Sequence, residues 1–301
     1  MVNIWTAWRS CRGARMHRGI ASFARTRKDL VVSDLGARYA VCERVLRLGS
    51  FDDDVAAAAD LGVAAIAVDA QVLDDVDPEE ARRILDGAGM AVSSYIGLGP
   101  VLAVGGGVTS VDEVTRRLDI AATVGAPNAL VTTGPLGGRN PLEADDECRE
   151  WLGKAGLRAA ARNMRVMLEP VHPILRRWSY VHQLTHALEL VDGVEGTGVL
   201  IDFGHLFWER GLAETIRMNV DTIASVQVTS LDEDALESGR FLRAPVSGGA
   251  VRVADLVYVL EDAGYRGWYE DETNLRLART DRINMVREAR TWFAALDERT
   301  R

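Results

Sequence analysis

The chain has little lysine, little cysteine and no long apolar run. Its only lysines are Lys28 and Lys154, and Lys154 lies in a helical pattern, so neither is well placed for Schiff-base chemistry. The 3 cysteines are widely spaced and include no C-x-x-C pair. This excludes a disulfide framework and a zinc knuckle, and favours a reducing, cytoplasmic location. No stretch approaches the roughly 18 consecutive apolar residues that a membrane-spanning helix needs.

The overall composition is that of a globular protein with an acidic surface. The 301 residues are 48% hydrophobic and 26% charged, and the net charge is -9. This length allows two domains of about 150 residues or one large fold. An acidic balance argues against non-specific binding to nucleic acids or anionic membranes, because both need basic patches.

The positive charge is concentrated at the N-terminus. Residues 1–28 contain seven basic residues and no acidic ones, so the rest of the chain carries about -16. We therefore expect residues 1–38 to form a basic N-terminal arm and residues 39–301 to form the folded domain. The arm is interpreted as a loosely ordered segment, or as the result of a start codon assigned upstream of Met16, which would then be the true initiator. A basic contact arm and a targeting segment remain the alternatives.

From residue 39 the sequence alternates apolar runs with amphipathic helical stretches. The expected strands are 41–46, 63–68, 92–96, 129–133, 165–169, 198–202, 223–230 and 268–272. Helical stretches follow them, the last one over 282–296. Eight strand–helix pairs in about 260 residues predict a single (β/α)8 TIM barrel. A doubly wound sheet is less consistent, because no Gly-x-Gly-x-x-Gly turn follows the first strand.

Oxygen-donor side chains stand at the ends of the last four predicted strands. They are Glu169, Asp202, Gln227 and Glu272. The carboxyl ends of the strands form the active-site face of a (β/α)8 barrel, so these side chains should converge. Buried carboxylates are costly unless they are paired or bind a cation. The set predicts a hard-cation site, with Mn²⁺ expected and Mg²⁺ or Co²⁺ as alternatives.

These motifs resemble the sugar phosphate isomerase/epimerase family, the xylose isomerase-like barrels, over residues 40–297. The resemblance rests on Leu168-Glu169-Pro170, Asp202-Phe-Gly-His205, Val226-Gln227-Val228 and Gly264-Tyr-Arg-Gly267 leading to Glu272. It implies a divalent metal held by Glu169, Asp202, Gln227 and Glu272, with Glu169 and Glu272 also acting as the acid/base pair. The resemblance also implies three substrate-binding residues. His205 matches the histidine of the family's Asp-x-x-His motif, and His172 matches the histidine of a Glu-Pro-x-His-Pro variant. Arg243 matches an arginine that precedes a Gly-rich turn in the family. His182 and His186 are expected to pack on a helix.

The implied activity is metal-dependent isomerisation or epimerisation of a ketose or sugar-like α-hydroxyketone through an enediolate. A dehydratase of an inosose- or dehydroshikimate-like ketone is the alternative, because Gln227 stands where many epimerases have histidine. A non-catalytic barrel that serves as a binding partner is a third interpretation. We expect a small-molecule, sugar-like substrate, and neither nucleic acid nor membrane as a partner. A homo-oligomer is left open.

Overall fold

The computed structural model describes residues 35–103, 107–275 and 277–299. Most of the predicted arm, and part of the Gly105-Gly-Gly segment expected to be a loop, lie outside these residues. Residues 35–38 belong to the compact unit that holds the rest of the described chain. Within it Leu35 is fully buried, and Arg38 forms an ion pair with Glu261.

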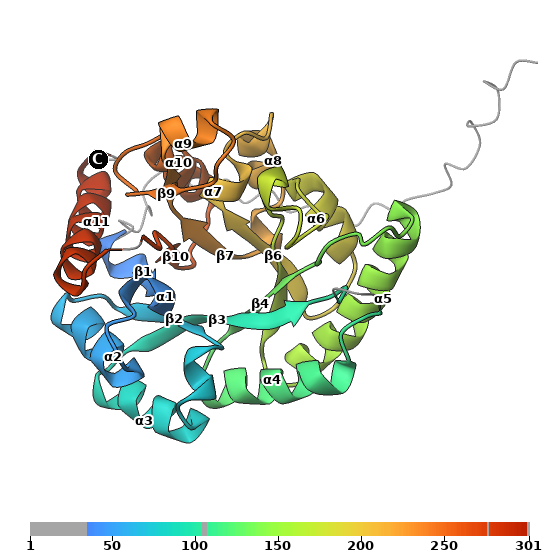
Figure 1. Ribbon diagram of the computed structural model, residues 1–301, viewed down its shortest axis with the longest axis horizontal. Helices are drawn as coiled ribbons and strands as arrows, with labels where there is room; N and C mark the ends of the chain where they lie inside the picture. The colour runs from blue at the N-terminus through green and yellow to red at the C-terminus, as the bar shows by residue number, and fades with distance from the viewer. Residues whose placement is uncertain (1–34, 104–106, 276, 300–301) are drawn as a thin grey trace, which may run out of the picture. The chain divides into compact units, whose positions relative to one another are not determined.

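Eight parallel strands close into a barrel, which confirms the predicted fold (Figure 1). Their order around the ring is β1-β10-β7-β6-β5-β4-β3-β2. The barrel strands are β1 (Tyr39–Cys42), β2 (Ala65–Asp69), β3 (Ala91–Pro100), β4 (Asn128–Thr132), β5 (Arg165–Leu168), β6 (Thr197–Asp202), β7 (Ile223–Val228) and β10 (Tyr269–Asp271). A separate antiparallel pair, β8 (Ser230–Leu231) and β9 (Arg243–Ala244), follows β7.

Helices surround the barrel and cover its strands (Figure 1). The α-helices are α1 (Glu43–Leu46), α2 (Phe51–Asp60), α3 (Pro78–Gly87), α4 (Val111–Thr123), α5 (Pro141–Ala160), α6 (Leu184–Val191), α7 (Phe203–Leu206), α8 (Leu212–Met218), α9 (Glu233–Glu237), α10 (Val253–Ala263) and α11 (Arg279–Arg299). Short 3-10 turns are η1 (Gly36–Arg38), η2 (Val72–Asp74), η3 (Pro173–Leu175) and η4 (Val220–Thr222). None of the helices in the described part of the chain is long and apolar enough to cross a bilayer.

Local sequence signals explain where several helices begin. The side chains of Ser50, Asp77, Ser110 and Asn140 each accept a hydrogen bond from a backbone N–H in the first turn of the following helix. These N-caps satisfy donors that the helix itself cannot pair. Proline also stands at the start of α3 and α5, where its fixed φ suits the helix and its missing N–H costs nothing.

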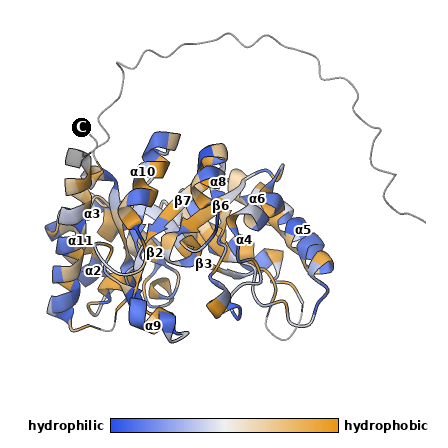
Figure 2. Cartoon of the chain, turned by 90° about the horizontal axis from the view of Figure 1, so that it is seen from above, coloured by the Kyte–Doolittle hydropathy of each residue, from blue (hydrophilic) through white to orange (hydrophobic). Residues whose placement is uncertain are grey.

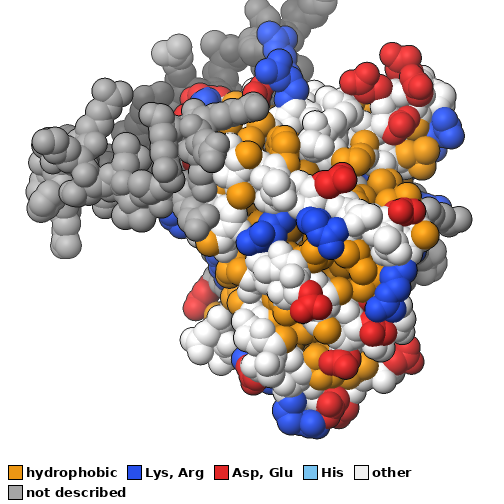
Figure 3. Space-filling model, turned by 90° about the vertical axis from the view of Figure 1, so that its left-hand side faces the viewer, with side chains coloured by type: hydrophobic (Ala, Val, Ile, Leu, Met, Phe, Trp, Pro, Cys, Tyr) orange, Lys and Arg blue, Asp and Glu red, His pale blue; other side chains and the backbone are white. Residues whose placement is uncertain are grey.

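The core consists of the barrel strands and the inner faces of the helices (Figure 2). β1 pairs with β10, so the first and last strands of the chain close the ring. On the outside of this closure, Tyr39 and Tyr269 pack against Phe293 of α11 at centroid distances of 5.6 and 5.4 Å. On the face shown in Figure 3, acidic and basic side chains are interspersed.

The predicted first strand, 41–46, is only partly correct. The strand ends at Cys42, and the next four residues form the short helix α1. All of these residues except Arg44 are buried and mainly apolar, and an apolar run alone does not distinguish a buried strand from a buried helical turn. The predicted seventh strand also divides into β7 and β8, and the other boundaries move by a few residues. These differences determine which side chains stand at the mouth of the barrel.

Candidate active site

The four predicted metal ligands all lie at the carboxyl-terminal ends of barrel strands. Glu169 directly follows β5, Asp202 ends β6, Gln227 is the last but one residue of β7, and Glu272 directly follows β10. Asp202 and Gln227 are partners in the register of β6 and β7. All four side chains belong to buried residues, so the fold brings acidic and amide groups together away from bulk water.

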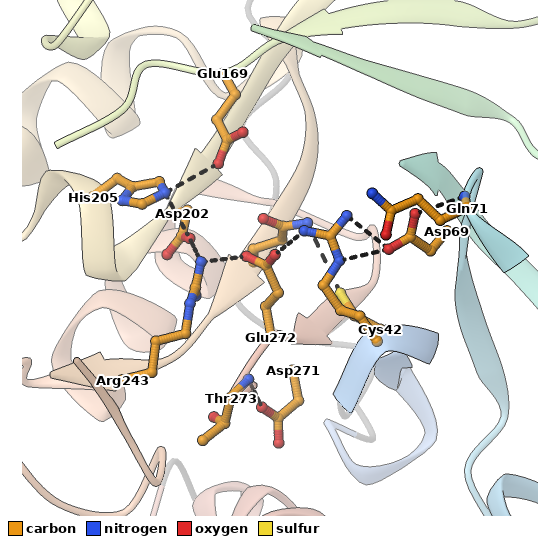
Figure 4. Close-up of polar contacts among 12 residues, drawn as sticks. Cys42, Asp69, Gln71, Glu169, Asp202, His205, Arg243, Asp271, Glu272 and Thr273 are labelled. Carbon is orange, nitrogen blue, oxygen red and sulfur yellow. Dashed lines mark hydrogen bonds and ion pairs between the residues drawn. The ribbon is translucent and has the colours of Figure 1, made fainter. Parts of the chain in front are cut away.

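Three side chains form a cluster with the geometry of a metal site. One potential ligand atom from each of Glu169, Asp202 and His205 lies within 4.8 Å of the others. His205 Nε2 is 3.5 Å from Glu169 Oε1 and 3.5 Å from Asp202 Oδ2 (Figure 4). Two of these residues belong to the predicted ligand set, whereas His205 was expected to bind substrate. The structure therefore brings a histidine nitrogen into the group as well.

The turn that carries His205 depends on a glycine. Asp202 is the N-cap of α7, and its Oδ1 accepts a hydrogen bond from the Gly204 amide at 2.7 Å. A Cβ at position 204 would lie 2.7 Å from Thr229 Cγ2, which is closer than van der Waals contact allows. Glycine thus lets α7 start close to β7, and Asp202 keeps only Oδ2 for the centre of the site.

Burial determines the protonation of this cluster. Desolvation, followed by the charges of Glu272 and Asp202, raises the pKa of Glu169 well above its usual value. Desolvation, with a further contribution from the positive charge of Arg243, lowers the pKa of His205 to about 3. His205 is therefore neutral at physiological pH and has a nitrogen lone pair for a cation or a substrate hydroxyl.

Gln227 has a polar atom without a partner. Its Nε2 lies 3.9 Å from Cys42 Sγ, but Oε1 accepts no hydrogen bond from any described residue although it is buried. A buried carbonyl oxygen left unpaired costs free energy, and a hard cation is a natural partner for it. This unpaired oxygen, on the register partner of Asp202, fits a divalent metal with Glu169, Asp202, Gln227 and Glu272 as oxygen donors.

Arg243 occupies the space between two of these carboxylates. Its Nη2 lies 2.7 Å from Glu272 Oε2 and 3.2 Å from Asp202 Oδ2 (Figure 4). Arg243 lies on β9, and the Ser247-Gly-Gly turn follows it. Gly249 has a φ of +78°, and a Cβ there would lie 2.3 Å from the Leu231 carbonyl oxygen, so this turn requires glycine. The predicted substrate-binding arginine is therefore in the site and is bound to the acids.

A second arginine, which the sequence did not single out, contacts the same glutamate. Arg44 Nη1 lies 3.0 Å from Glu272 Oε1, and its Nε and Nη2 both lie 3.0 Å from Asp69 Oδ2. Arg47 also reaches Asp69, at 3.4 Å. Asp69 ends β2, and Arg44 comes two residues after β1. Examining the ends of the first two strands as well as the last four would have found both residues.

The site opens into a pocket with a charged side and an apolar side. Its volume is about 380 Å³. Arg44, Glu169, His205, Arg243 and Glu272 line the charged side. The apolar side is formed by Ile96, Leu130, Val171, Leu175, Trp178 and Phe241. A ligand that fills this pocket meets charged groups on one face and hydrocarbon and aromatic surface on the other.

The other three histidines in the described part of the chain lie outside this pocket lining. His172 caps η3, accepting a hydrogen bond from the Ile174 amide, and its ring packs against Phe207, Trp208 and Phe241. Its predicted substrate contact remains a prediction. His182 precedes α6 and contacts the Val171 carbonyl, whereas His186 lies within α6 and contacts Asp145. Only His186 is on the helix that was expected to carry both.

Comparison with known proteins adds a family and a set of folds. A family model described as xylose isomerase-like TIM barrel matches residues 55–296. No curated protein sequence matches the chain. Three solved structures illustrate the shared fold. The IolI protein, described with a bound zinc atom, is 13% identical, with a TM-score of 0.73 over 86% of this chain and 98% of that one.

The other two structures carry names of enzymes. The 3-keto-D-glucoside 4-epimerase YcjR from E. coli is 18% identical, with a TM-score of 0.68 over 86% of this chain and 99% of that one. The probable 3-DHS dehydratase AsbF from Bacillus anthracis is 15% identical, with a TM-score of 0.66 over 84% of this chain and 97% of that one. At these identities the likeness concerns the fold.

Proposed function

Since this chain belongs to the xylose isomerase-like TIM-barrel family, we propose that it is a divalent-metal-dependent isomerase or epimerase of a ketose or related α-hydroxyketone. The observation that carries the proposal is the buried cluster of Glu169, Asp202 and His205, with Glu272 bridged to Asp202 through Arg243 and an unpaired Oε1 on the buried Gln227. Mn²⁺ is the proposed metal, because most of these donors are oxygens.

The proposed metal ligands are Glu169, Asp202, Gln227 and Glu272, and His205 lies close enough to Glu169 and Asp202 to share the site. A cation bound there would polarise a substrate carbonyl and its neighbouring hydroxyl and acidify the C–H beside the carbonyl. Glu169 and Glu272 extend from different strands of the barrel wall toward the pocket. One carboxylate removes the proton, and the other, or the same one, returns it to carbon.

The other pocket residues bind and orient the substrate. The neutral His205 can accept a hydrogen bond from a hydroxyl or donate one, and Arg243 supplies N–H donors for negatively charged oxygens. Phe241 and Trp178 offer flat apolar surfaces on which the C–H face of a sugar-like ring can pack. This combination of polar and apolar walls supports a small polyhydroxylated ketone as the substrate class.

The test is hydrogen exchange at carbon. Purified protein is screened with ketoses and inososes in D₂O with Mn²⁺, and deuterium incorporation is followed by NMR. Glu169→Gln and Glu272→Gln should each lower the exchange rate by about 10²-fold or more, the usual contribution of a general acid or base. Glu80→Gln is the matched control, because Glu80 is on the surface of α3 and its carboxylate forms an ion pair with Arg83 alone among the described residues.

The outcomes separate the possible reactions. An unchanged product mass supports the isomerase or epimerase, whereas a product lighter by one water supports the dehydratase. Exchange retained in both glutamate variants would remove these residues from the acid/base role. A protein whose melting temperature and exchange are both insensitive to EDTA and to added Mn²⁺ would contradict the metal dependence.

A further inference from the structure

Arg243 contacts two of the proposed metal ligands. One nitrogen, Nη2, contacts both Asp202 Oδ2 and Glu272 Oε2. Oδ2 is the oxygen of Asp202 left for a metal, because Oδ1 already accepts the Gly204 amide. A Mg²⁺-sized ion binds oxygen at roughly 2.0–2.1 Å, closer than this nitrogen approaches either oxygen, so it would need the same oxygens. Arg243 and a metal ion therefore compete for these two oxygens.

The second arginine is held more firmly than the first. Arg44 directs two nitrogens at Asp69 and a third at Glu272, so it remains anchored if Glu272 turns toward a metal. Arg243, in contrast, has a buried Nη1 with no hydrogen-bond partner among the described residues. It also lies on the two-residue strand β9, outside the barrel sheet. Arg243 is therefore the arginine that a metal ion can displace.

A displaced Arg243 would still face the pocket. Its guanidinium carbon is 5.9 Å from the ring centroid of Phe241, which lines the apolar side. An aromatic face attracts a guanidinium, so this ring offers a second position close to the first. From there the N–H groups of Arg243 would be free of the carboxylates and available to a negatively charged oxygen of the substrate.

We propose that Arg243 is the counter-ion of the metal ligands whenever no metal is bound, and that divalent metal binding displaces it and makes it available to the substrate. This inference rests on the proposed metal site. In the metal-free protein Arg243 offsets the repulsion between Asp202 and Glu272. In the metal-bound protein the ion takes over that role. Metal binding and recognition of an anionic or oxyanionic substrate group are thereby coupled through one side chain.

Metal affinity without substrate tests the inference. Mn²⁺ binding to the chelator-treated full chain is measured by isothermal titration calorimetry for the wild type and for Arg243→Met, which removes the charge and keeps much of the length. Removing a cation that competes directly for two ligand oxygens should tighten Mn²⁺ binding by about tenfold or more. Arg252→Met is the matched control, because the Arg252 side chain is 82% exposed and, among the described residues, forms an ion pair with Asp255 alone. It should bind Mn²⁺ as the wild type does.

A second measurement follows Arg243 itself. Phenylglyoxal modifies accessible arginines, and peptide mass spectrometry resolves Arg243 from the others. Saturating Mn²⁺ should accelerate modification of Arg243 in the wild type and leave modification of Arg252 unchanged. This measurement needs no variant and therefore still tests the inference if Arg243→Met fails to fold.

The failures can be told apart. Suppose that the wild type binds Mn²⁺ and that Arg243→Met binds it equally well or more weakly. The counter-ion role is then wrong and the proposed function stands. The same conclusion follows if Mn²⁺ does not expose Arg243 to phenylglyoxal. If neither protein binds a divalent ion, both proposals fail.

Discussion

Glu43 allows a quantitative prediction about pH. It is the first residue of α1, is 1% exposed, and its Oε2 has no hydrogen-bond partner among the described residues. Burial, followed by a hydrogen bond with Asp54 and the charge of Asp54, raises the pKa of Glu43 from 4.5 to about 9. Glu43 therefore keeps its proton at neutral pH and shares it with Asp54.

The raised pKa of Glu43 determines how the stability of the protein changes with pH. A carboxyl group whose pKa is raised in the folded protein contributes stability that is fully present below its unfolded pKa and is lost as the pH rises through its folded pKa. Between those limits one proton changes the free energy of unfolding by up to about 1.4 kcal/mol per pH unit. From pH 6 to pH 8 the loss can reach about 3 kcal/mol. Glu43→Gln keeps an N–H donor for Asp54 and does not titrate, so it should avoid this loss.

The assay is urea unfolding of the wild type and Glu43→Gln at several pH values from 6 to 8.5. Titrating groups outside the Glu43–Asp54 pair act equally on both proteins, so the difference between the two curves isolates this pair. We expect Glu43→Gln to gain stability relative to the wild type as the pH rises. Glu80→Gln, which removes an exposed carboxylate, should run parallel to the wild type. A parallel profile for Glu43→Gln as well would refute a buried, protonated Glu43.

Two further predictions concern the site. Gln227→Leu removes the unpaired Oε1 and should weaken Mn²⁺ binding by about tenfold. The urea midpoint should stay unchanged or rise, because a buried unsatisfied oxygen is gone. Unchanged Mn²⁺ affinity in calorimetry would exclude Gln227 as a ligand. Gly204→Ala should destabilise the protein by about 1–3 kcal/mol, because the new Cβ overpacks against Thr229. Gly153→Ala in α5 has open space around the new Cβ and should stabilise the protein by about 0.5–1 kcal/mol. Equal melting temperatures for these two glycine variants would contradict the tight turn at Gly204.

The sequence predicted the barrel and the strand-end positions of four polar side chains because both follow from local order, whereas the role of these side chains as metal ligands stays a prediction. Strands alternate with helices, and Glu169, Asp202, Gln227 and Glu272 each stand at or near the end of a strand, so a closed parallel barrel brings them to one face. The N-cap of α3 at Asp77 was also predictable, because Asp-Pro at a helix start is a local signal.

The ion-pair arrangement was not predictable from local order. Arg44 and Glu272 are far apart in the sequence and meet only because β1 and β10 are neighbours in the ring. The packing of His172 among three rings likewise depends on Phe241 from a different loop. Whether a strand-end side chain faces a ligand, an arginine or an aromatic cluster is decided by tertiary packing, which a motif does not encode.

The closure between β1 and β10 also has a consequence for biosynthesis. A chain emerging from the ribosome displays β1 at residues 39–42 long before its partner at 269–271 exists. Glu272 is made immediately after that partner, and its ion pair with Arg44 spans the same seam. The nascent barrel must therefore wait with one strand edge unpaired until nearly the whole protein has been translated. Completion of the site coincides with closure of the ring, so a prematurely terminated product that lacks the final strand would lack the chemistry too.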